Sequence, residues 1–330
     1  MSAVSQTGYV FKLAVGQSCV AAATQDCSIR LIDTLTFSLI NEVKAHETTI
    51  TDLQNVPSSV TGAGSGGVFL SASQDGTVKV WDLRESQSCM TIRMSTNQVD
   101  APVFAATVDT AGTCAASSGS NISLFKFGEW KKKFEYTECH YESVSSLFFF
   151  ESYLVSGGED GLVNVLDIND LVNEDDGQAP KLTINTNDSI RGLTRIGDQE
   201  IGVFSTTESL SKWNLNTGEQ IGQSFSVLTN PLLATLDNEI YQSYGYIVGM
   251  NGNNLIAGNA MGKLVEFDSN MNVSNIFGNG HQSVVRSIVN NGAIITAGED
   301  GKVIEWALQN TIEHDYQYSA RKSHVRANPY

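Results

Sequence analysis

The chain has 330 residues, of which 41% are hydrophobic, and its 36 acidic and 20 basic residues leave a formal net charge of −16. The hydrophobic content excludes a disordered chain. The acidic balance argues against direct binding of nucleic acid, whose phosphate backbone requires a basic surface, and favours either simple solubility or a basic protein partner.

No apolar run reaches the roughly 18–20 residues that a membrane helix needs, so we predict no contact with a membrane. Residues 1–17 lack the basic start and the apolar core of a signal peptide. The five cysteines form no CxxC pair and fit no zinc site or disulfide framework. We therefore expect a nuclear or cytoplasmic protein, or one present in both compartments, and not a secreted one.

In chain order, seven segments share small residues, a turn, alternating apolar residues, and then an aromatic or aliphatic residue near an acidic or polar one. They are residues 22–35, 71–84, 116–127, 156–169, 203–216, 257–270 and 296–309. Their aligned large residues are Ile32, Trp81, Phe125, Leu166, Trp213, Phe267 and Trp306, at spacings of 39 to 54 residues. Self-similarity at such a period indicates a repeat protein.

Each segment predicts two short strands joined by a tight turn, because apolar and polar residues alternate with a period of two. Asp75-Gly76, Asp160-Gly161 and Asp300-Gly301 provide the turns, with glycine at the position that needs a positive φ. Further apolar runs, such as residues 143–150 and 283–290, precede the pairs, and others follow them. We therefore expect about four strands per unit and almost no helix.

These repeats resemble the WD-repeat β-propeller family, in which four-stranded blades surround a central channel. Residues 157–169 with 173–176, and residues 280–306, resemble the WD repeat-containing protein 89 group within it. The resemblance implies an all-β, seven-bladed propeller of antiparallel blades over residues 1–312, followed by a flexible basic tail at 313–330. An end strand is expected to complete the last blade, and residues 2–6, 9–15 and 316–318 are all candidates.

The resemblance also implies structural tetrads, in which a buried histidine bonds to a hydroxyl and an aspartate, and a tryptophan N–H completes the chain. The implied sets are His46, Ser71, Asp75 and Trp81 in blade 2, His140, Ser156 and Asp160 in blade 4, and His281, Thr296, Asp300 and Trp306 in blade 7. In blade 4, Leu166 replaces the tryptophan, and blade 1 keeps only Asp26. A catalytic triad is the alternative, but recurrence at the blade spacing favours a structural role.

No other motif indicates catalysis, so we expect no enzyme, cofactor or metal. Gly62, Gly64 and Gly67 form a GxGxxG pattern, but it lies in a Ser/Gly-rich stretch that leads into a strand rather than opening a helix. We interpret residues 58–67 as a loop between the first two strands of blade 2.

Four features remain as candidate contacts, and all have ordinary structural alternatives. Residues 169–180 form an acidic insertion with Asp170, Glu174, Asp175 and Asp176, which is either a solvated loop or a docking site for a basic partner. Residues 129–136 contain three consecutive lysines, and residues 319–330 form the basic tail. Arg84 ends a WDLR sequence that resembles the WDxR box of substrate receptors of cullin–RING ubiquitin ligases.

In WD-repeat propellers the aspartate turns share one face with the blade-to-blade connections. The loop at residues 58–67, the acidic insertion and Arg84 would then share the opposite face. We expect a non-enzymatic scaffold, monomeric within a complex, that binds a basic protein through acidic loops. A ligase substrate receptor that uses Arg84 is the alternative.

Overall fold

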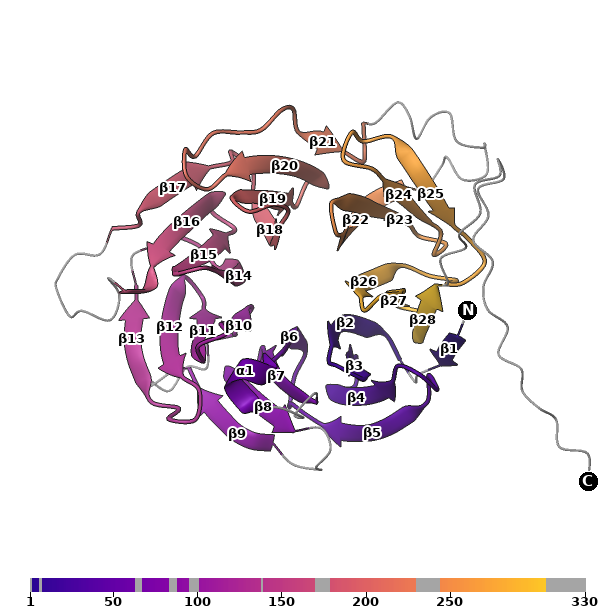
Figure 1. The fold of residues 1–330 in the computed structure, drawn as a ribbon, viewed down its shortest axis with the longest axis horizontal. Helices are drawn as coiled ribbons and strands as arrows, with labels where there is room; N and C mark the ends of the chain where they lie inside the picture. The colour runs from indigo at the N-terminus through magenta and orange to yellow at the C-terminus, as the bar shows by residue number, and fades with distance from the viewer. Residues whose placement is uncertain are drawn as a thin grey trace, which may run out of the picture.

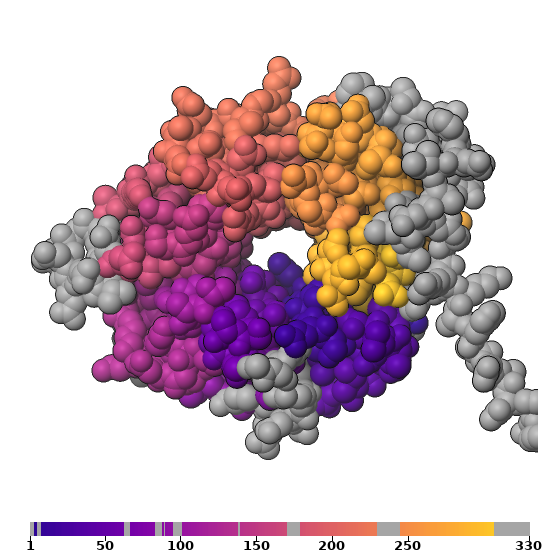
Figure 2. All heavy atoms as spheres, in the orientation of Figure 1, coloured from indigo at the N-terminus to yellow at the C-terminus, as the bar shows by residue number. Residues whose placement is uncertain are grey.

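The computed structural model describes residues 2–5, 8–62, 67–82, 88–94, 101–137, 139–169, 179–229 and 244–306. Within these residues the strands form seven antiparallel sheets of four strands each. The sheets are arranged as blades around a central opening, which remains visible when all atoms are drawn (Figures 1 and 2). The predicted all-β, seven-bladed propeller is confirmed.

In each blade the strands follow one another from the central opening of the ring outwards. Blade 1 contains β2 (Val10–Val15), β3 (Cys19–Thr24), β4 (Ser28–Asp33) and β5 (Leu39–Lys44). Blade 2 contains β6 (Ile50–Asn55), β7 (Val68–Ser73), β8 (Thr77–Asp82) and β9 (Ser88–Arg93). Blade 3 contains β10 (Ala106–Val108), β11 (Thr113–Ser118), β12 (Asn121–Lys126) and β13 (Lys132–Tyr136). Blade 4 contains β14 (Val144–Phe150), β15 (Tyr153–Gly158), β16 (Leu162–Asp167) and β17 (Leu182–Asn185).

The other three blades repeat the pattern. Blade 5 contains β18 (Ile190–Arg195), β19 (Glu200–Ser205), β20 (Ser209–Asn214) and β21 (Phe225–Ser226). Blade 6 contains β22 (Tyr244–Asn251), β23 (Asn254–Asn259), β24 (Leu264–Phe267) and β25 (Val273–Phe277). Blade 7 contains β26 (Val285–Asn290), β27 (Ile294–Gly298), β28 (Lys302–Trp306) and the N-terminal β1 (Ser2–Ser5).

The blades form because apolar strands alternate with tight turns. In blade 2, every residue of β7 is buried, and Gly76 takes a φ of 77° between β7 and β8. Such a backbone favours glycine, which has no Cβ to clash. The same residue type takes the same conformation at Gly161 and Gly301 in blades 4 and 7, so the Asp-Gly pairs mark the turns as predicted.

The hydrophobic core lies between the blades. The described residues form seven clusters of buried apolar side chains, and each cluster joins two adjacent blades. The cluster between blades 1 and 2, for example, packs Ile29 and Leu31 of β4 against Phe69 and Trp81 of blade 2. Every blade therefore depends on two neighbours for the burial of its two faces.

Polar contacts that involve at least one innermost strand also join each blade to the next. They are Lys12–Asp52, Thr51–Val103, Ser117–Val144, Ser145–Ile190, Arg191–Ile247, Tyr246–Val285 and Ser287–Leu13, in order around the ring. In these contacts a side chain of one blade bonds to the backbone of its neighbour, except for the Lys12–Asp52 ion pair at 3.6 Å. All seven blade-to-blade contacts therefore include a polar connection.

The ring closes through β1, which pairs with β28 so that Ser2 lies opposite Glu305 and Ser5 opposite Lys302. Of the three candidate closing segments, residues 2–6 contain this strand, whereas residues 9–15 contribute the innermost strand of blade 1. The third candidate and the predicted tail lie outside the described residues.

One local expectation needs correction. Residues 58–67 were expected to form a loop, but Ser58–Thr61 form a one-turn helix, α1, that Gly62 ends with a φ of 90°. Pro57 precedes the helix with a φ of −56° and a ψ of 141°, so it is extended and lies just outside the first turn.

Candidate functional site

The two faces of the propeller differ in their connections. We call the face with the second-to-third strand turns at Asp75, Asp160 and Asp300 the turn face. Because neighbouring strands are antiparallel, the blade-to-blade connections also lie on this face. The opposite face carries α1 and the two described ends, residues 168–169 and 179–181, of the connection at residues 168–181, and we call it the loop face.

On the turn face, the four residues expected to form a tetrad in blade 2 are in contact. His46 lies with Nδ1 2.9 Å from Asp75 Oδ2 and Nε2 2.7 Å from Ser71 Oγ. Trp81 Nε1 donates to Ser71 Oγ at 2.8 Å. Because a carboxylate can only accept, His46 donates from Nδ1 and accepts the Ser71 proton at Nε2. The set therefore forms one continuous chain of hydrogen bonds across the blade.

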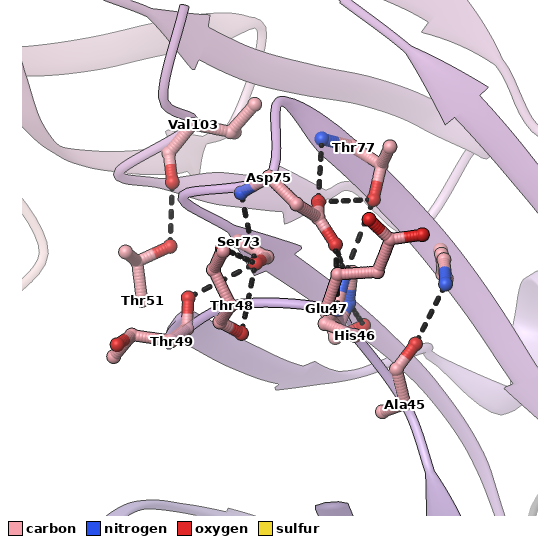
Figure 3. A network of polar contacts seen from close by, with 12 residues as sticks. Ala45, His46, Glu47, Thr48, Thr49, Thr51, Ser73, Asp75, Thr77 and Val103 are labelled. Atoms are coloured by element: carbon pink, nitrogen blue, oxygen red, sulfur yellow. Dashed lines mark hydrogen bonds and ion pairs between the residues drawn. The ribbon is translucent and has the colours of Figure 1, made fainter. Parts of the chain in front are cut away.

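Two more residues of this network had not been recognised in the sequence (Figure 3). Thr77 Oγ1 donates to Asp75 Oδ1 at 2.5 Å. The fully buried Ser73 accepts from the Asp75 backbone N–H at 3.1 Å and donates to the Thr49 carbonyl at 3.0 Å. These hydroxyls hold the turn against the incoming blade connection, but Ser and Thr are too common in strands to indicate this role from sequence.

Blades 4 and 7 repeat the arrangement with one substitution. In blade 7, His281 lies 2.9 Å from Asp300 and 2.8 Å from Thr296, whose hydroxyl accepts from Trp306 at 2.8 Å. In blade 4, His140 lies 3.1 Å from Asp160 and 2.8 Å from Ser156. Asn164 approaches the blade 4 histidine at 3.4 Å and donates to the Cys139 carbonyl. With leucine at the tryptophan position, an amide thus provides the extra polar contact.

Burial controls the protonation of these groups. Removal from water lowers the pKa of His46 and of His140, although Asp75 and Asp160 respectively oppose the shift. Burial would raise the pKa of Asp75, but the hydrogen bond from Thr77 and the contacts with His46 outweigh it and lower that pKa. A neutral imidazole beside an ionised carboxylate is the state that the hydrogen-bond pattern requires.

The geometry does not support a catalytic triad. Ser71 is fully buried and His46 is 2% exposed, so no substrate can reach the hydroxyl. That hydroxyl also accepts from Trp81 while it bonds to His46. The arrangement can connect strands, but it offers no accessible nucleophile.

Other blades use different residues at the equivalent level. In blade 1 the buried Arg30 guanidinium bonds to Asp26 at 3.1 Å and to Glu42 at 2.9 Å. In blade 5 the hydroxyls of Ser205, Thr207 and Ser209 bond to one another. The four-stranded blade therefore does not require a histidine in every copy.

Blade 6 contains a buried carboxylate near the loop face. Glu266 is 5% exposed, and it accepts from the side-chain amides of Asn251 at 2.9 Å, Asn254 at 3.0 Å and Asn275 at 3.3 Å. These residues come from all four strands of the blade. Asn290 of blade 7 also donates to Asn251 at 2.6 Å, so the network extends to the next blade.

The loop face carries an acidic rim on blades 4 and 5, which we define as Glu151, Asp167, Asp198 and Glu200. All four lie at strand ends next to the first-to-second strand turns or the connection at residues 168–181. The backbone N–H of Ile168 donates to the Ser152 carbonyl at 2.9 Å, which ties that connection to the Glu151 turn. Asp170, Glu174, Asp175 and Asp176, as well as Arg84, lie outside the described residues.

The described residues provide no metal centre and no membrane helix. None of their histidine, cysteine, aspartate and glutamate side chains gather in groups of three that would hold a metal. No helix in the described part of the chain is long and apolar enough to span a membrane. A cavity of about 510 Å³ opens into the channel, and its cations Lys12, Arg191 and Arg286 each pair with an acidic side chain.

Comparisons with known proteins agree with this geometry. Residues 37–82 match the model of the family "WD domain, G-beta repeat". The matched unit starts just before the outermost strand of blade 1 and ends after the third strand of blade 2, so a sequence repeat straddles two blades. The seven four-stranded sheets define the chain as a β-propeller, and the matched repeat makes it similar to the WD-repeat proteins.

The similarity to WD-repeat proteins extends over almost the whole chain. The chain is 28% identical to WD repeat-containing protein 89 homolog from Dictyostelium discoideum, over 93% of this chain and 84% of that protein. It is 24% identical to WD repeat-containing protein GTS1 from Arabidopsis thaliana, over 90% of this chain and 81% of that protein. The predicted resemblance is confirmed. WD-repeat proteins act as protein-interaction scaffolds, and the family is generally non-enzymatic.

Proposed function

We propose that this propeller is a non-enzymatic scaffold that binds a basic protein through the acidic rim and the adjoining acidic insertion at residues 169–180. The observation that carries the proposal is the distribution of ion pairs. Glu151, Asp167 and Glu200 have no ion pair among the described residues, although they share one end of two adjacent blades. A negative surface of this kind attracts cationic partners and steers their approach.

Of the two cations nearest in sequence to the rim, only Arg195 pairs with a rim carboxylate, that of Asp198. Lys181 lies over the Tyr153 ring at 4.3 Å, and Arg195 lies over the Phe150 ring at 4.8 Å while it pairs with Asp198 at 3.5 Å. The acidic insertion leaves the blade directly beside Asp167 and adds four carboxylates without a single base. Excess negative charge at this edge is therefore left for a partner.

The test is affinity purification of the full chain from nuclear and cytoplasmic extracts, the compartments expected for it, at low and high salt. Replacing Glu174, Asp175 and Asp176 by their amides should weaken capture of the basic partner. Added salt should weaken it too, because exposed charge pairs are screened over about 8–10 Å.

The matched control replaces Glu47, Glu142 and Glu159, three exposed acids on the turn face, and should leave capture unchanged. Equal loss in both triple variants would reduce the effect to net charge and contradict the assigned surface. Loss of a ubiquitin-ligase adaptor in Arg84→Ala, with the acidic variants unaffected, would instead support the substrate-receptor alternative.

A further inference from the structure

The loop face also carries a basic and aromatic surface, which we call the lysine–tryptophan patch. It consists of Phe127, Trp130, Lys126, Lys131 and Lys133. These residues lie in and beside the turn between β12 and β13, the third and outermost strands of blade 3. The proposed scaffold function does not use them.

The aromatic part of the patch is firmly held and partly open to solvent. The rings of Phe127 and Trp130 pack with centroids 4.6 Å apart at an angle of 60°. Both are half-buried against the apolar cluster between blades 2 and 3, together with Val60 of α1. Ser59 of α1 also donates to the Thr110 carbonyl at 2.9 Å, so the helix is anchored to blade 3. The partly exposed rings thus sit on a rigid support.

Positive charge is concentrated around these rings. Residues 126–133 contain four lysines and one glutamate in a chain whose acids greatly outnumber its bases. The pKa of Glu129 is lowered, chiefly by its contact with Lys133 and further by Lys126 and Lys131. Lys133 pairs with Glu129 at 2.5 Å and Lys132 pairs with Glu135 at 2.7 Å. The exposed Lys131 has no ion pair among the described residues.

From this geometry we propose that the lysine–tryptophan patch is a second docking surface, which binds an acidic protein segment containing an aromatic or large aliphatic side chain. The lysines supply charge complementarity, and the partly exposed Trp130 ring supplies an apolar anchor of the type that dominates interface energy. A protein segment fits better than nucleic acid, because it can carry fewer negative charges than a polyphosphate and is therefore opposed less by the net charge of −16.

The loop face therefore carries both the basic lysine–tryptophan patch and the acidic rim. The patch lies on blade 3 and the acidic rim begins on the adjacent blade 4. A scaffold with such a face holds an acidic segment and a basic segment side by side. The lysine–tryptophan patch does not depend on the acidic rim, so either surface can be tested without the other.

The test measures fluorescence polarisation of a labelled synthetic peptide in which glutamates are interleaved with phenylalanines, using the intact full-length chain. We expect saturable, salt-sensitive binding that Lys131→Glu weakens by about fivefold to tenfold. The same peptide with glutamine in place of glutamate should not bind. Lys263→Glu is the matched control, because this half-exposed lysine lies on the turn face without an ion pair among the described residues.

Tryptophan emission gives an independent readout. Peptide binding should change the emission of the wild type, and Trp130→Phe should remove that change while the protein remains folded. Equal affinity of wild type and Lys131→Glu would overturn the proposal. Tighter binding of a single-stranded oligonucleotide that competes with the peptide would overturn the choice of an acidic protein segment.

Discussion

His46 and His140 show that burial decides whether a group of aspartate, histidine and serine side chains has a structural or a catalytic role. Their partners are an aspartate and a serine, as in many hydrolases, but both imidazoles are almost completely enclosed. Enclosure lowers the pKa of each, so the neutral form is held as an acceptor for the serine proton. The three groups therefore connect neighbouring strands instead of activating a nucleophile.

The lowered histidine pKa values predict a loss of stability in mild acid. The unfolded chain binds protons at the ordinary imidazole pKa of 6.5, whereas folded His46 and His140 resist protonation. Their contribution is therefore fully present above that value and declines as the pH falls through it towards the lower folded pKa. We expect the urea midpoint to fall between about pH 7 and about pH 5.

The variant His46→Gln/His140→Gln should be less stable overall but should show a smaller pH slope over the same range. An undiminished slope would assign the proton uptake to other groups. At lower pH the lowered pKa values of Asp75 and Asp300 add a second loss, because their contribution declines as the pH falls below the ordinary carboxyl value of 3.8.

At the scale of single elements, the blades differ in how they are fastened. Blades 2, 4 and 7 use a buried histidine near the turn face, blade 1 uses the Arg30 guanidinium, and blade 6 adds Glu266 with three amides near the loop face. The buried Glu266 carboxylate has no cationic partner among the described residues, so its amide donors carry the full burden of replacing water.

Glu266→Ala should therefore destabilise the protein strongly. It leaves three amide groups without their acceptor, and each buried unsatisfied group costs about 1–3 kcal/mol. Glu266→Gln should cost less, because it retains an acceptor and the side-chain volume. Chemical denaturation of both variants tests this. If alanine and glutamine were equally mild, the network would make little contribution to the stability of blade 6.

The strands and turns were predictable where a local signal exists. The Asp-Gly pairs and the period of two locate β7, β8, β15, β16, β27 and β28, because both features arise from a few consecutive residues. The Glu266 network was not recognised, since its members are separated along the chain and asparagine is ordinary in turns. The role of Arg30 was not predicted either, because only the fold shows that this charged residue of β4 is buried.

Other features depend on the complete ring. Three segments were candidates for the closing strand, because the sequence of a short strand such as residues 2–5 does not specify which sheet edge it pairs with. The fold identifies residues 2–5 as the closing strand, because it places β28 next to blade 1, where β1 can pair with it. The acidic insertion and Arg84 remain predictions from sequence. The basic run at residues 129–136 was a candidate contact from sequence, but only the fold shows that its Trp130 side chain packs with Val60 of α1 against the same apolar cluster.

At the scale of the whole molecule, stability depends on the closed ring of seven blades. Each apolar cluster needs two blades, and each pair of adjacent blades also shares a polar contact. Blade 7 receives its outermost strand from the other end of the chain. Loss of one strand therefore affects the contacts of two blades.

Deletion of residues 2–5 should lower the melting temperature and expose blade 7 to proteolysis. The deletion removes four paired residues and the Val4 side chain, which packs against the cluster between blades 7 and 1. Scanning calorimetry and limited proteolysis provide the measurements, with Ala3→Ser, which retains the strand, as the control because Ala3 is exposed. Unchanged melting of the deletion variant would show that blade 7 is stable with three strands.

Pairing between β1 and β28 also has a consequence for the order of synthesis. β1 is synthesised about 300 residues before its partner β28, so the two strands can pair only after residue 306 has left the ribosome. Contacts of such long range are slow to form. Until they form, the outer edge of β28 offers unpaired backbone groups to any strand nearby, including β1 of another copy. Exchange of β1 between copies is therefore the characteristic misassembly expected of this ring, and exposure is greatest between the synthesis of β28 and its pairing with β1.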